Sequence, residues 1–298
     1  MKKDSKTPAA GAVRETSTGN AAGAGKRRSA RAWLAAPYGA WMIAFIIIPL
    51  VMVFVYGLTD KSGNFTLANI LSIAEPVNRK AFWLSLELSA LCTLICLVLA
   101  WPLASILTKI KSAGSVIVLL FILPMWMNFL LRTLAWLTLL EKNGVINTIL
   151  RLLHLPTMSI INTPAAIILG MVYNFVPFMI LPIYNVLSKI DVNIINAARD
   201  LGASRFQTFR RITLPLSVPG IISGITMVFV PSLTTFVISD ILGGSKIMLI
   251  GNVIEQKFKV GDNWNAGSGL SLVLMVFILI SMAVTTKYDK KSGGQSTW

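Results

Sequence analysis

Long uncharged apolar runs alternate with short polar segments along most of this 298-residue chain. A helix needs roughly 20 residues to cross the hydrocarbon core of a bilayer, because each residue adds about 1.5 Å to its length. The runs are continuously apolar, whereas the strands of a membrane barrel alternate over about 10 residues. The pattern therefore predicts an all-α integral membrane protein with six transmembrane helices. The expected spans lie near residues 36–58, 82–108, 115–140, 164–188, 212–240 and 267–286.

Composition and charge support this class and orient the chain. Hydrophobic residues make up 55% of it and charged residues 13%, against about 25% charged in soluble domains. The net charge of +15 is typical of nucleic-acid binding, but the hydropathy argues against that partner. Of the 27 Lys and Arg residues, 18 lie in the two terminal segments and the loops 109–111 and 189–211, and 8 lie in the alternate loops. The positive-inside rule then predicts a multi-pass protein of the cell membrane with both termini cytoplasmic.

The first 31 residues have too little apolar surface to fold alone, and they carry eight of the basic residues. They are interpreted as a disordered basic cytoplasmic leader, followed by a transmembrane domain over residues 32–298. The apolar run after the leader is too long for a signal-peptide core, so we expect an uncleaved first span. The leader either attracts lipid headgroups or is a solvated tail that enforces orientation, and the second interpretation is favoured.

Residue types that carry catalytic or metal chemistry are scarce. Cys92 and Cys96 lie four apart inside a span and are expected to be small buried residues. His154, the only histidine, has no Cys or His cluster near it, which argues against a metal site. The chain contains no Gly-x4-Gly-Lys-Ser/Thr phosphate loop and no His-Glu-x-x-His motif. We therefore expect no enzyme activity and no cofactor bound by this chain.

The polar segment 191–211 carries sequence signals of ordered helices. Asp191 is placed to cap a helix, and Gly202 follows the helical pattern where a left-handed turn ends helices. Ser204 and Gln207 form a capping-box pattern, which predicts a second helix. The segment is therefore a short helix, a glycine bend and a second helix leading into the fifth span. By these features alone, a docking site for another protein and an interfacial helix lying on the bilayer are equally favoured.

The same segment resembles the cytoplasmic motif of ABC-type importer permeases, written Glu-Ala-Ala, three residues, Gly, nine residues, Ile-x-Leu-Pro. Both spacings are intact here, and Asn196 stands where the family usually has Glu. In that family the first helix of the motif docks on the ATP-binding subunit and transmits its closure to the spans. The resemblance thus implies coupling roles for Asn196, Ala197, Ala198, Asp200, Gly202, Ala203, Ile212, Leu214 and Pro215.

Four further stretches resemble the first permease of the spermidine/putrescine importers: "ILPMWMNFLLRTLAW", "VYNFVPFMILPIY", "AARDLGASRFQTF" and "VISDILGGSKIMLIGNVIEQKF". The resemblance covers roughly residues 32–290. It implies the type I ABC importer permease architecture and transport of polyamines by alternating access. The implied partners are a sister permease, two ATP-binding subunits that hold ATP and Mg, and an external substrate-binding protein, within the lipid bilayer. Iron, sulfate and molybdate permeases share the layout, so another substrate such as an oxyanion, iron or a sugar remains the alternative. A stand-alone channel or an intramembrane enzyme is less favoured.

A polycation is expected to meet acids and aromatic faces on its path. Charges inside spans usually face the bundle interior, because each costs about 2.5–3.5 kcal/mol at the centre of the bilayer. Alternatives apply to each candidate: Glu87 and Arg132 pair with each other, Asp240 caps the external segment, and tryptophans near span ends anchor the protein in the interface. The candidate path residues are Glu87, Trp126, Arg132, Trp136, Tyr173, Phe175, Phe236 and Asp240.

Overall fold

The computed structural model describes residues 37–110, 114–244, 246–260 and 263–291, and it divides into two units, residues 1–52 and 53–298. The expected leader, residues 1–31, lies outside the described residues. Within the described residues every named element is a helix, and the β-type pairing is a single isolated bridge between Thr59 and Phe65. The predicted all-α class is therefore confirmed.

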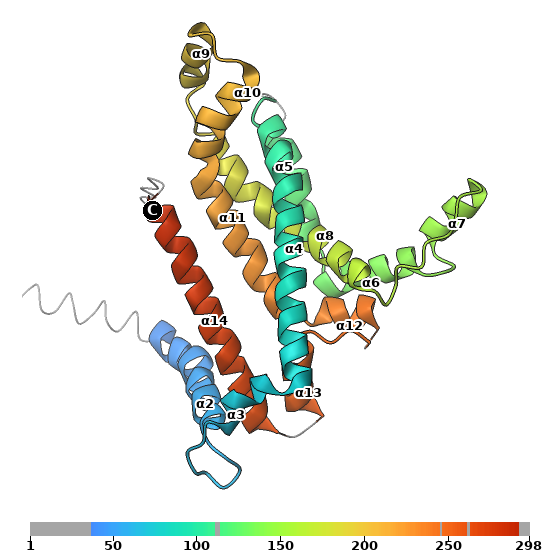
Figure 1. Cartoon of the computed structure of the whole chain (residues 1–298), viewed down its shortest axis with the longest axis vertical. Coiled ribbons are helices and arrows are strands. Elements are labelled where there is room, and N and C mark those ends of the chain that lie inside the picture. The colour runs from blue at the N-terminus through green and yellow to red at the C-terminus, as the bar shows by residue number, and fades with distance from the viewer. Residues whose placement is uncertain (1–36, 111–113, 245, 261–262, 292–298) are drawn as a thin grey trace, which may run out of the picture. The chain divides into compact units, whose positions relative to one another are not determined.

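The helices follow one another with short connections (Figure 1). Their bounds, with 3₁₀ and π segments marked η, are η1 Ile43–Ile47, α2 Ile48–Gly57, α3 Ala68–Leu71, η2 Ser72–Ala74, α4 Pro76–Leu107, α5 Gly114–Ile122, η3 Leu123–Trp126, α6 Phe129–Leu140, α7 Val145–Leu152, α8 Pro164–Leu187, α9 Val192–Asp200, α10 Arg205–Thr208, η4 Phe209–Thr213, α11 Leu214–Thr234, α12 Val237–Gly243, α13 Ile250–Lys259 and α14 Trp264–Lys291.

Among the described residues, five continuous helical stretches are long and apolar enough to cross a membrane. A sixth candidate is a pair of helices joined at a sharp bend, which gives six spans if that pair counts as one. In the smaller unit, the described residues 37–52 expose nearly all of their large apolar side chains. The five stretches are Pro37–Gly57, Pro76–Leu107, Pro164–Leu187, Arg205–Thr234 and Trp264–Tyr288.

Helices α4, α8 and α11 pack side by side and hold the main core of the larger unit. Every fourth residue of α4 from Leu88 to Ala104 is buried, and this stripe includes Cys92 and Cys96. The Cys96 thiol lies 3.9 Å from the Val172 carbonyl oxygen of α8. The two cysteines are therefore the small buried residues that their spacing predicts, and they let α4 approach α8 closely.

Glycines set the approach of α11 to α8. A Cβ atom on Gly220 would lie 2.8 Å from the Pro182 carbonyl oxygen, and one on Gly224 would lie 2.5 Å from the Met179 sulfur. The two glycines are four residues apart and so share one face of the helix. Small residues at this spacing let membrane helices approach backbone to backbone. The contact places α11, which follows the 191–211 segment, directly against α8.

The third expected span, 115–140, is broken. The helical stretch ending at Trp126 meets the one beginning at Phe129 at 97°. Pro124 lies in the 3₁₀ turn before the break, and Asn128 caps the next helix by accepting hydrogen bonds from the Leu130 and Leu131 amides. The Arg132 Nη1 atom then donates to the Pro124 carbonyl oxygen at 2.8 Å, across the break. A continuous apolar run conceals this break, because its cause is a proline and a polar cap rather than a change in hydropathy.

The fifth expected span, 212–240, begins earlier and ends earlier than its hydropathy suggests. The helix runs over Arg205–Thr234. Thr235 is then extended, with ψ of 139°, and α12 forms a separate short helix over Val237–Gly243. Asp240 therefore lies in α12, outside the continuous span. Figure 1 shows α9 and α10 at one end of the α4–α8–α11 group and α12 and α13 at the other.

Candidate functional site

The segment between α8 and α11 folds as its sequence predicts. The Asp191 carboxylate accepts a hydrogen bond from the Asn193 amide and caps α9. At the other end, the Gly202 amide donates to Arg199 O at 2.9 Å and the Ala203 amide to Ala198 O at 3.0 Å. This pair of bonds is the Schellman arrangement, and it requires the left-handed backbone that Gly202 has, with φ of +82°. The helix and the glycine bend are thus confirmed.

The second helix of the segment continues into the membrane. The Ser204 hydroxyl accepts from the Gln207 amide while the Gln207 side chain accepts from the Ser204 amide, which completes the predicted capping box. The helix then runs through the π segment η4 into α11 and forms one stretch from Arg205 to Thr234. A displacement of α10 is therefore a displacement of the end of α11 itself.

Trp101 of α4 anchors this segment to the spans. Its ring lies 4.6 Å from that of Phe209, centroid to centroid, in a T-shaped contact. Its Nε1 atom donates to the Ser217 hydroxyl of α11 at 3.3 Å. Phe209 also lies 6.2 Å from Phe206. The aromatic contacts therefore join α4, η4 and the start of α11.

The predicted coupling residues divide into an exposed tip and a packed base. Around the bend, Leu201 is 89% exposed and Phe206 is 67% exposed. Two large apolar side chains this exposed on a capped, well-formed element indicate a contact surface for another molecule. Exposed residues of the set are Asn196, Ala197, Asp200, Gly202 and Pro215, and half-buried ones are Ala198, Ala203, Ile212 and Leu214.

At the opposite end of the larger unit, Asp240 belongs to a hydrogen-bonded cluster. The Asn252 Nδ2 atom donates to the Asp240 carboxylate at 2.7 Å and to the Phe236 carbonyl oxygen at 3.1 Å. The Asn252 Oδ1 atom accepts from the Ser239 hydroxyl and from the Leu249 amide. Asn252, of which 3% is exposed, therefore fixes α12 against the start of α13.

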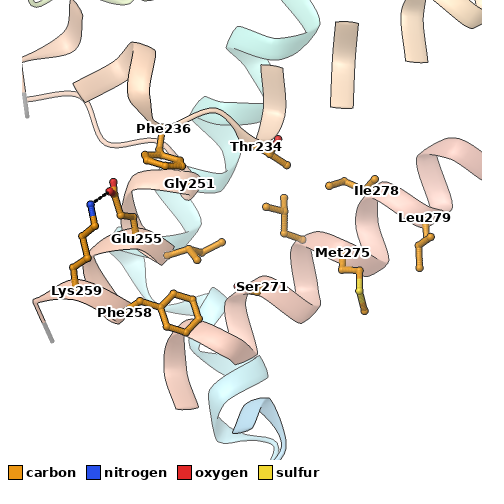
Figure 2. A pocket seen from close by; sticks show the side chains of 12 residues that line it. Thr234, Phe236, Gly251, Glu255, Phe258, Lys259, Ser271, Met275, Ile278 and Leu279 are labelled. Atoms are coloured by element: carbon orange, nitrogen blue, oxygen red, sulfur yellow. Dashed lines mark hydrogen bonds and ion pairs between the residues drawn. The ribbon is translucent and has the colours of Figure 1, made fainter. Parts of the chain in front are cut away.

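A mostly apolar pocket of about 640 Å³ opens beside this cluster, between α13, α14 and the end of α11. Figure 2 shows Phe236, Glu255 and Lys259 on one side of it, opposite Ile278 and Leu279. Glu255 and Lys259 form an ion pair at 2.5 Å, and the Glu255 side chain is 18% exposed against 72% for Lys259. The pocket thus combines aromatic walls with a carboxylate at its edge.

Electrostatics link Asp240 to this pocket. Partial burial raises the pKa of the Asp240 carboxyl, and the negative charge of Glu255 raises it further, while the Asn252 hydrogen bond and Lys259 oppose the change. The Glu255 carboxylate also raises the pKa of Lys259 by hydrogen bonding and by charge. The charges of Asp240, Glu255 and Lys259 are therefore electrostatically linked at the edge of the pocket. Glu255 is not among the candidates that the sequence suggested, although it lies inside the quoted 237–258 stretch.

The remaining candidates are placed apart from that pocket. Arg132 is 7% exposed and lies 5.9 Å from the Tyr173 ring, which in turn contacts Trp136 at 5.2 Å. Its Nε atom has no hydrogen-bond partner among the described residues. Glu87 is exposed on α4 and makes no ion pair with Arg132, so the expected alternative of a Glu87–Arg132 pair is wrong for the described chain.

Phe175 and Trp126 differ sharply in exposure. Phe175 is 7% exposed and belongs to the main core, whereas Trp126 is 82% exposed at the break of the third span. Burial in the core gives Phe175 a packing role in this arrangement. The candidate path residues thus lie in separate places. Arg132 and Trp136 of α6 lie beside Tyr173 of α8. Asp240 lies in α12, Trp126 at the break of the third span and Glu87 on α4.

Comparison with known proteins identifies relatives along nearly the whole chain. Residues 19–292 match the family described as binding-protein-dependent transport system inner membrane component. The spermidine/putrescine transport system permease protein PotB of Haemophilus influenzae is 38% identical over 260 residues, which cover 84% of this chain and 91% of that protein. PotB of Escherichia coli is 35% identical over 253 residues, or 82% of this chain and 92% of that protein.

Solved structures share the fold at low sequence identity. A chain of a bacterial ABC transporter that imports the acidic polysaccharide alginate matches with a TM-score of 0.76 at 18% identity, over 89% of this chain and 96% of that one. A chain of the MetNI methionine ABC transporter in an inward-facing conformation matches with a TM-score of 0.53 at 17% identity, over 72% and 94%. These likenesses confirm the type I ABC importer permease architecture that the sequence predicts.

Proposed function

We propose that this chain, which belongs to the family of binding-protein-dependent transport system inner membrane components, is the permease subunit through which an ATP-driven importer moves polyamines across the cell membrane. The observation that carries the proposal is identity of 35–38% to two spermidine/putrescine permeases over more than nine-tenths of their length. As a permease it is a transport subunit rather than an enzyme.

The proposed orientation places both termini and the α9–α10 segment in the cytoplasm. It is supported by the excess of Lys and Arg in the terminal segments and the loops on that face. The Asp240 cluster and the pocket beside Glu255 then lie toward the outside, because they are at the opposite end of the α4–α8–α11 group.

The proposed assembly contains this chain, a sister permease, two ATP-binding subunits and an external substrate-binding protein. One solved relative of the fold is a bacterial alginate ABC transporter in complex with a periplasmic protein that holds an alginate pentasaccharide. ATP and Mg are proposed to reside on the partner subunits, since this sequence has no phosphate loop. The exposed Leu201 and Phe206 side chains form the proposed contact with an ATP-binding subunit.

The proposed mechanism is alternating access driven through α11. Closure of the ATP-binding subunits moves α9 and α10, and the continuous helix from Arg205 to Thr234 carries that motion into the membrane. Trp101 transmits the same motion to α4 through its contacts with Phe209 and Ser217. Packed helices move as rigid bodies, so a displacement of the coupling segment also displaces the far end of the bundle.

Polyamine chemistry fits the site at α12 and α13. Polyamines carry several ammonium groups on an apolar chain, and such groups are attracted by carboxylates and by aromatic faces. Asp240 and Glu255 provide negative charge, and Phe236 and Phe258 provide rings beside the pocket. We propose that substrate passes this site after release from the binding protein.

The proposal is tested by uptake into proteoliposomes that hold the complete complex. Radiolabelled spermidine and putrescine are expected to accumulate only with ATP inside the vesicles and with the binding protein present. Sulfate, ferric iron and maltose serve as the rival substrates. Accumulation of a rival with no polyamine uptake would assign another substrate class, and flux without ATP would favour a channel.

A further inference from the structure

A second pocket, of about 580 Å³, lies beneath the coupling segment, where the ends of α4 and α8 meet α9, α10 and η4. Three basic side chains from three different elements line it: Lys109 after α4, Arg199 of α9 and Arg205 of α10. No acidic residue occurs among the described residues of its lining. The pocket is therefore positively charged on its polar side.

The three basic groups have no partner in the described part of the chain. Neither an ion pair nor a side-chain hydrogen bond involves Lys109, Arg199 or Arg205 among those residues. Like charges that converge on one cavity repel one another, and they are stabilised when an anion enters between them. The lining thus favours a negatively charged ligand and disfavours a polyamine, so this pocket is not suited to be the substrate exit.

Asn196, which lines the same pocket, bears on its excess of positive charge. In the motif that this segment resembles, the corresponding position usually carries Glu. A carboxylate there would neutralise part of the basic lining from within the chain. With Asn in its place, the neutral amide leaves the three positive charges uncompensated.

The other side of the pocket is apolar. Trp101, Leu187, Ile190 and Phe209 line it, and the first two of these belong to the membrane-spanning helices α4 and α8. A cavity with basic groups on one wall and aromatic and aliphatic groups on the other suits an amphiphile rather than a small free anion. Its position at the ends of two membrane helices brings it to the depth of lipid headgroups.

We propose that this pocket binds the phosphate group of an anionic phospholipid. Arg199 and Arg205 hold the phosphate oxygens, since the guanidinium fork matches phosphate geometry, and Lys109 adds a point charge. The acyl chains lie along the apolar wall. The lipid joins the ends of α4 and α8 to the coupling segment, so coupling between ATP hydrolysis and transport depends on anionic lipid.

Native mass spectrometry of the purified full-length chain, with whichever subunits copurify, tests the proposal after delipidation and separate addition of phosphatidylglycerol, phosphatidylcholine or inorganic phosphate. Wild type is expected to retain phosphatidylglycerol selectively. The double variant Arg199→Gln/Arg205→Gln and the single variant Asn196→Glu are expected to weaken retention by about fivefold for each unit of charge changed. Arg210→Gln is the matched control, because Arg210 is exposed on η4 but does not line the pocket.

Equal retention of phosphatidylglycerol by wild type and Asn196→Glu would overturn the proposal, since that variant changes only the charge of the pocket. Retention of inorganic phosphate with no preference between the two lipids would show a free-anion site and would overturn the assignment to lipid. Loss of an ATP-binding subunit from the preparation is a separate outcome that concerns the proposed transport function, because bound lipid is read as added mass on this chain whether or not other subunits are present.

Discussion

Asp240 is the residue whose surroundings differ most from what its position in the sequence suggests. It was expected at the end of a span, and it lies instead in α12, where Asn252 holds its carboxylate. Its pKa is raised by the partial burial of its carboxyl group and by the negative charge of Glu255. A raised carboxyl pKa means that the native state takes up a proton more readily than an ordinary carboxyl as the pH falls, so this group's contribution to stability grows toward acid and is lost as the pH rises.

The Asp240→Asn variant tests what the charge of this carboxylate contributes to stability and uptake. The amide keeps an oxygen that accepts from Asn252 and removes the repulsion with Glu255, so stability at neutral pH is expected to be unchanged or slightly higher. Loss of the charge at this exposed residue is expected to raise the KM for spermidine uptake about two- to fivefold. KM of the wild type is expected to rise as pH falls, because Asp240 becomes neutral, while the variant stays flatter. A variant with wild-type KM at every pH would remove Asp240 from the substrate path.

Gly202 is the residue on which the coupling segment turns. Its φ of +82° is unfavourable for residues with a Cβ atom. Apart from its chain neighbours, no heavy atom of the described residues lies within 4 Å of the position where a Cβ atom would stand. Substitution therefore acts through the backbone rather than through a clash.

Gly202→Val is expected to destabilise the bend by about 1–2 kcal/mol, a factor of about 5–30 in its population. Uptake by the reconstituted complex should fall while ATP hydrolysis persists, because the docking helix is misplaced. Gly202→Asn is the control, since Asn tolerates the left-handed region, and it should retain most of the uptake. Equal uptake by the Gly202→Val variant and the wild type at equal expression would refute the coupling role.

Helix ends marked by short sequence motifs could be predicted, whereas the break inside a continuous apolar run could not. The Asp191 cap, the Gly202 turn and the Ser204–Gln207 capping box each depend on residues close together in the sequence, and each is present in the structure. The break of the third span depends on Pro124, Asn128 and Arg132 acting together within an apolar run. Hydropathy averages over such a run and so predicts one continuous helix.

The candidate site was harder to predict because its members come together only in the folded chain. Phe236 caps α12, which carries Asp240, whereas Glu255 lies on α13 and lines the pocket together with Phe236. Asn252 of α13 joins the two helices by hydrogen bonds to Asp240 and Phe236. Arg132 and Glu87 look like a pair in the sequence and are not one in the structure, because Arg132 is bound at the Pro124 carbonyl oxygen. Long-range placement of this kind leaves no trace in residue spacing.

The contact of α11 with α8 gives a prediction about packing. A single methyl group at Gly220 would lie 2.8 Å from the Pro182 carbonyl oxygen, which belongs to the backbone and has little freedom to move. Gly220→Ala is therefore expected to destabilise the protein by about 1–3 kcal/mol through overpacking, measured as a lower midpoint of thermal unfolding in detergent. Gly39→Ala is the matched control, since no heavy atom of the described residues beyond its chain neighbours lies within 4 Å of a Cβ there. Equal midpoints for the two variants would contradict close helix packing at Gly220.

As a subunit, the chain presents two opposite ends that are proposed to face different compartments and partners. The α9–α10 end carries exposed apolar residues and the basic pocket, and the α12–α13 end carries the Asp240 and Glu255 carboxylates beside an apolar pocket. This polarity suits an importer of cations that receives substrate at one end and energy at the other. The native cysteines, Cys92 and Cys96, are buried within α4, so engineered cysteines can report on either end without removing them.

Leu201→Cys and Lys142→Cys test orientation and docking together. Leu201 lies at the tip of the coupling segment. Lys142 is exposed in the connection between α6 and α7, a loop that the proposed topology places on the external face. A membrane-impermeant maleimide is expected to label Lys142→Cys in intact cells and Leu201→Cys only in inside-out vesicles. Removal of the ATP-binding subunits should then increase labelling of Leu201→Cys severalfold, because the docked subunit covers that side chain, and leave Lys142→Cys unchanged. Labelling of Leu201→Cys from outside the cell would reverse the proposed topology, and labelling that ignores the ATP-binding subunits would place the docking surface elsewhere.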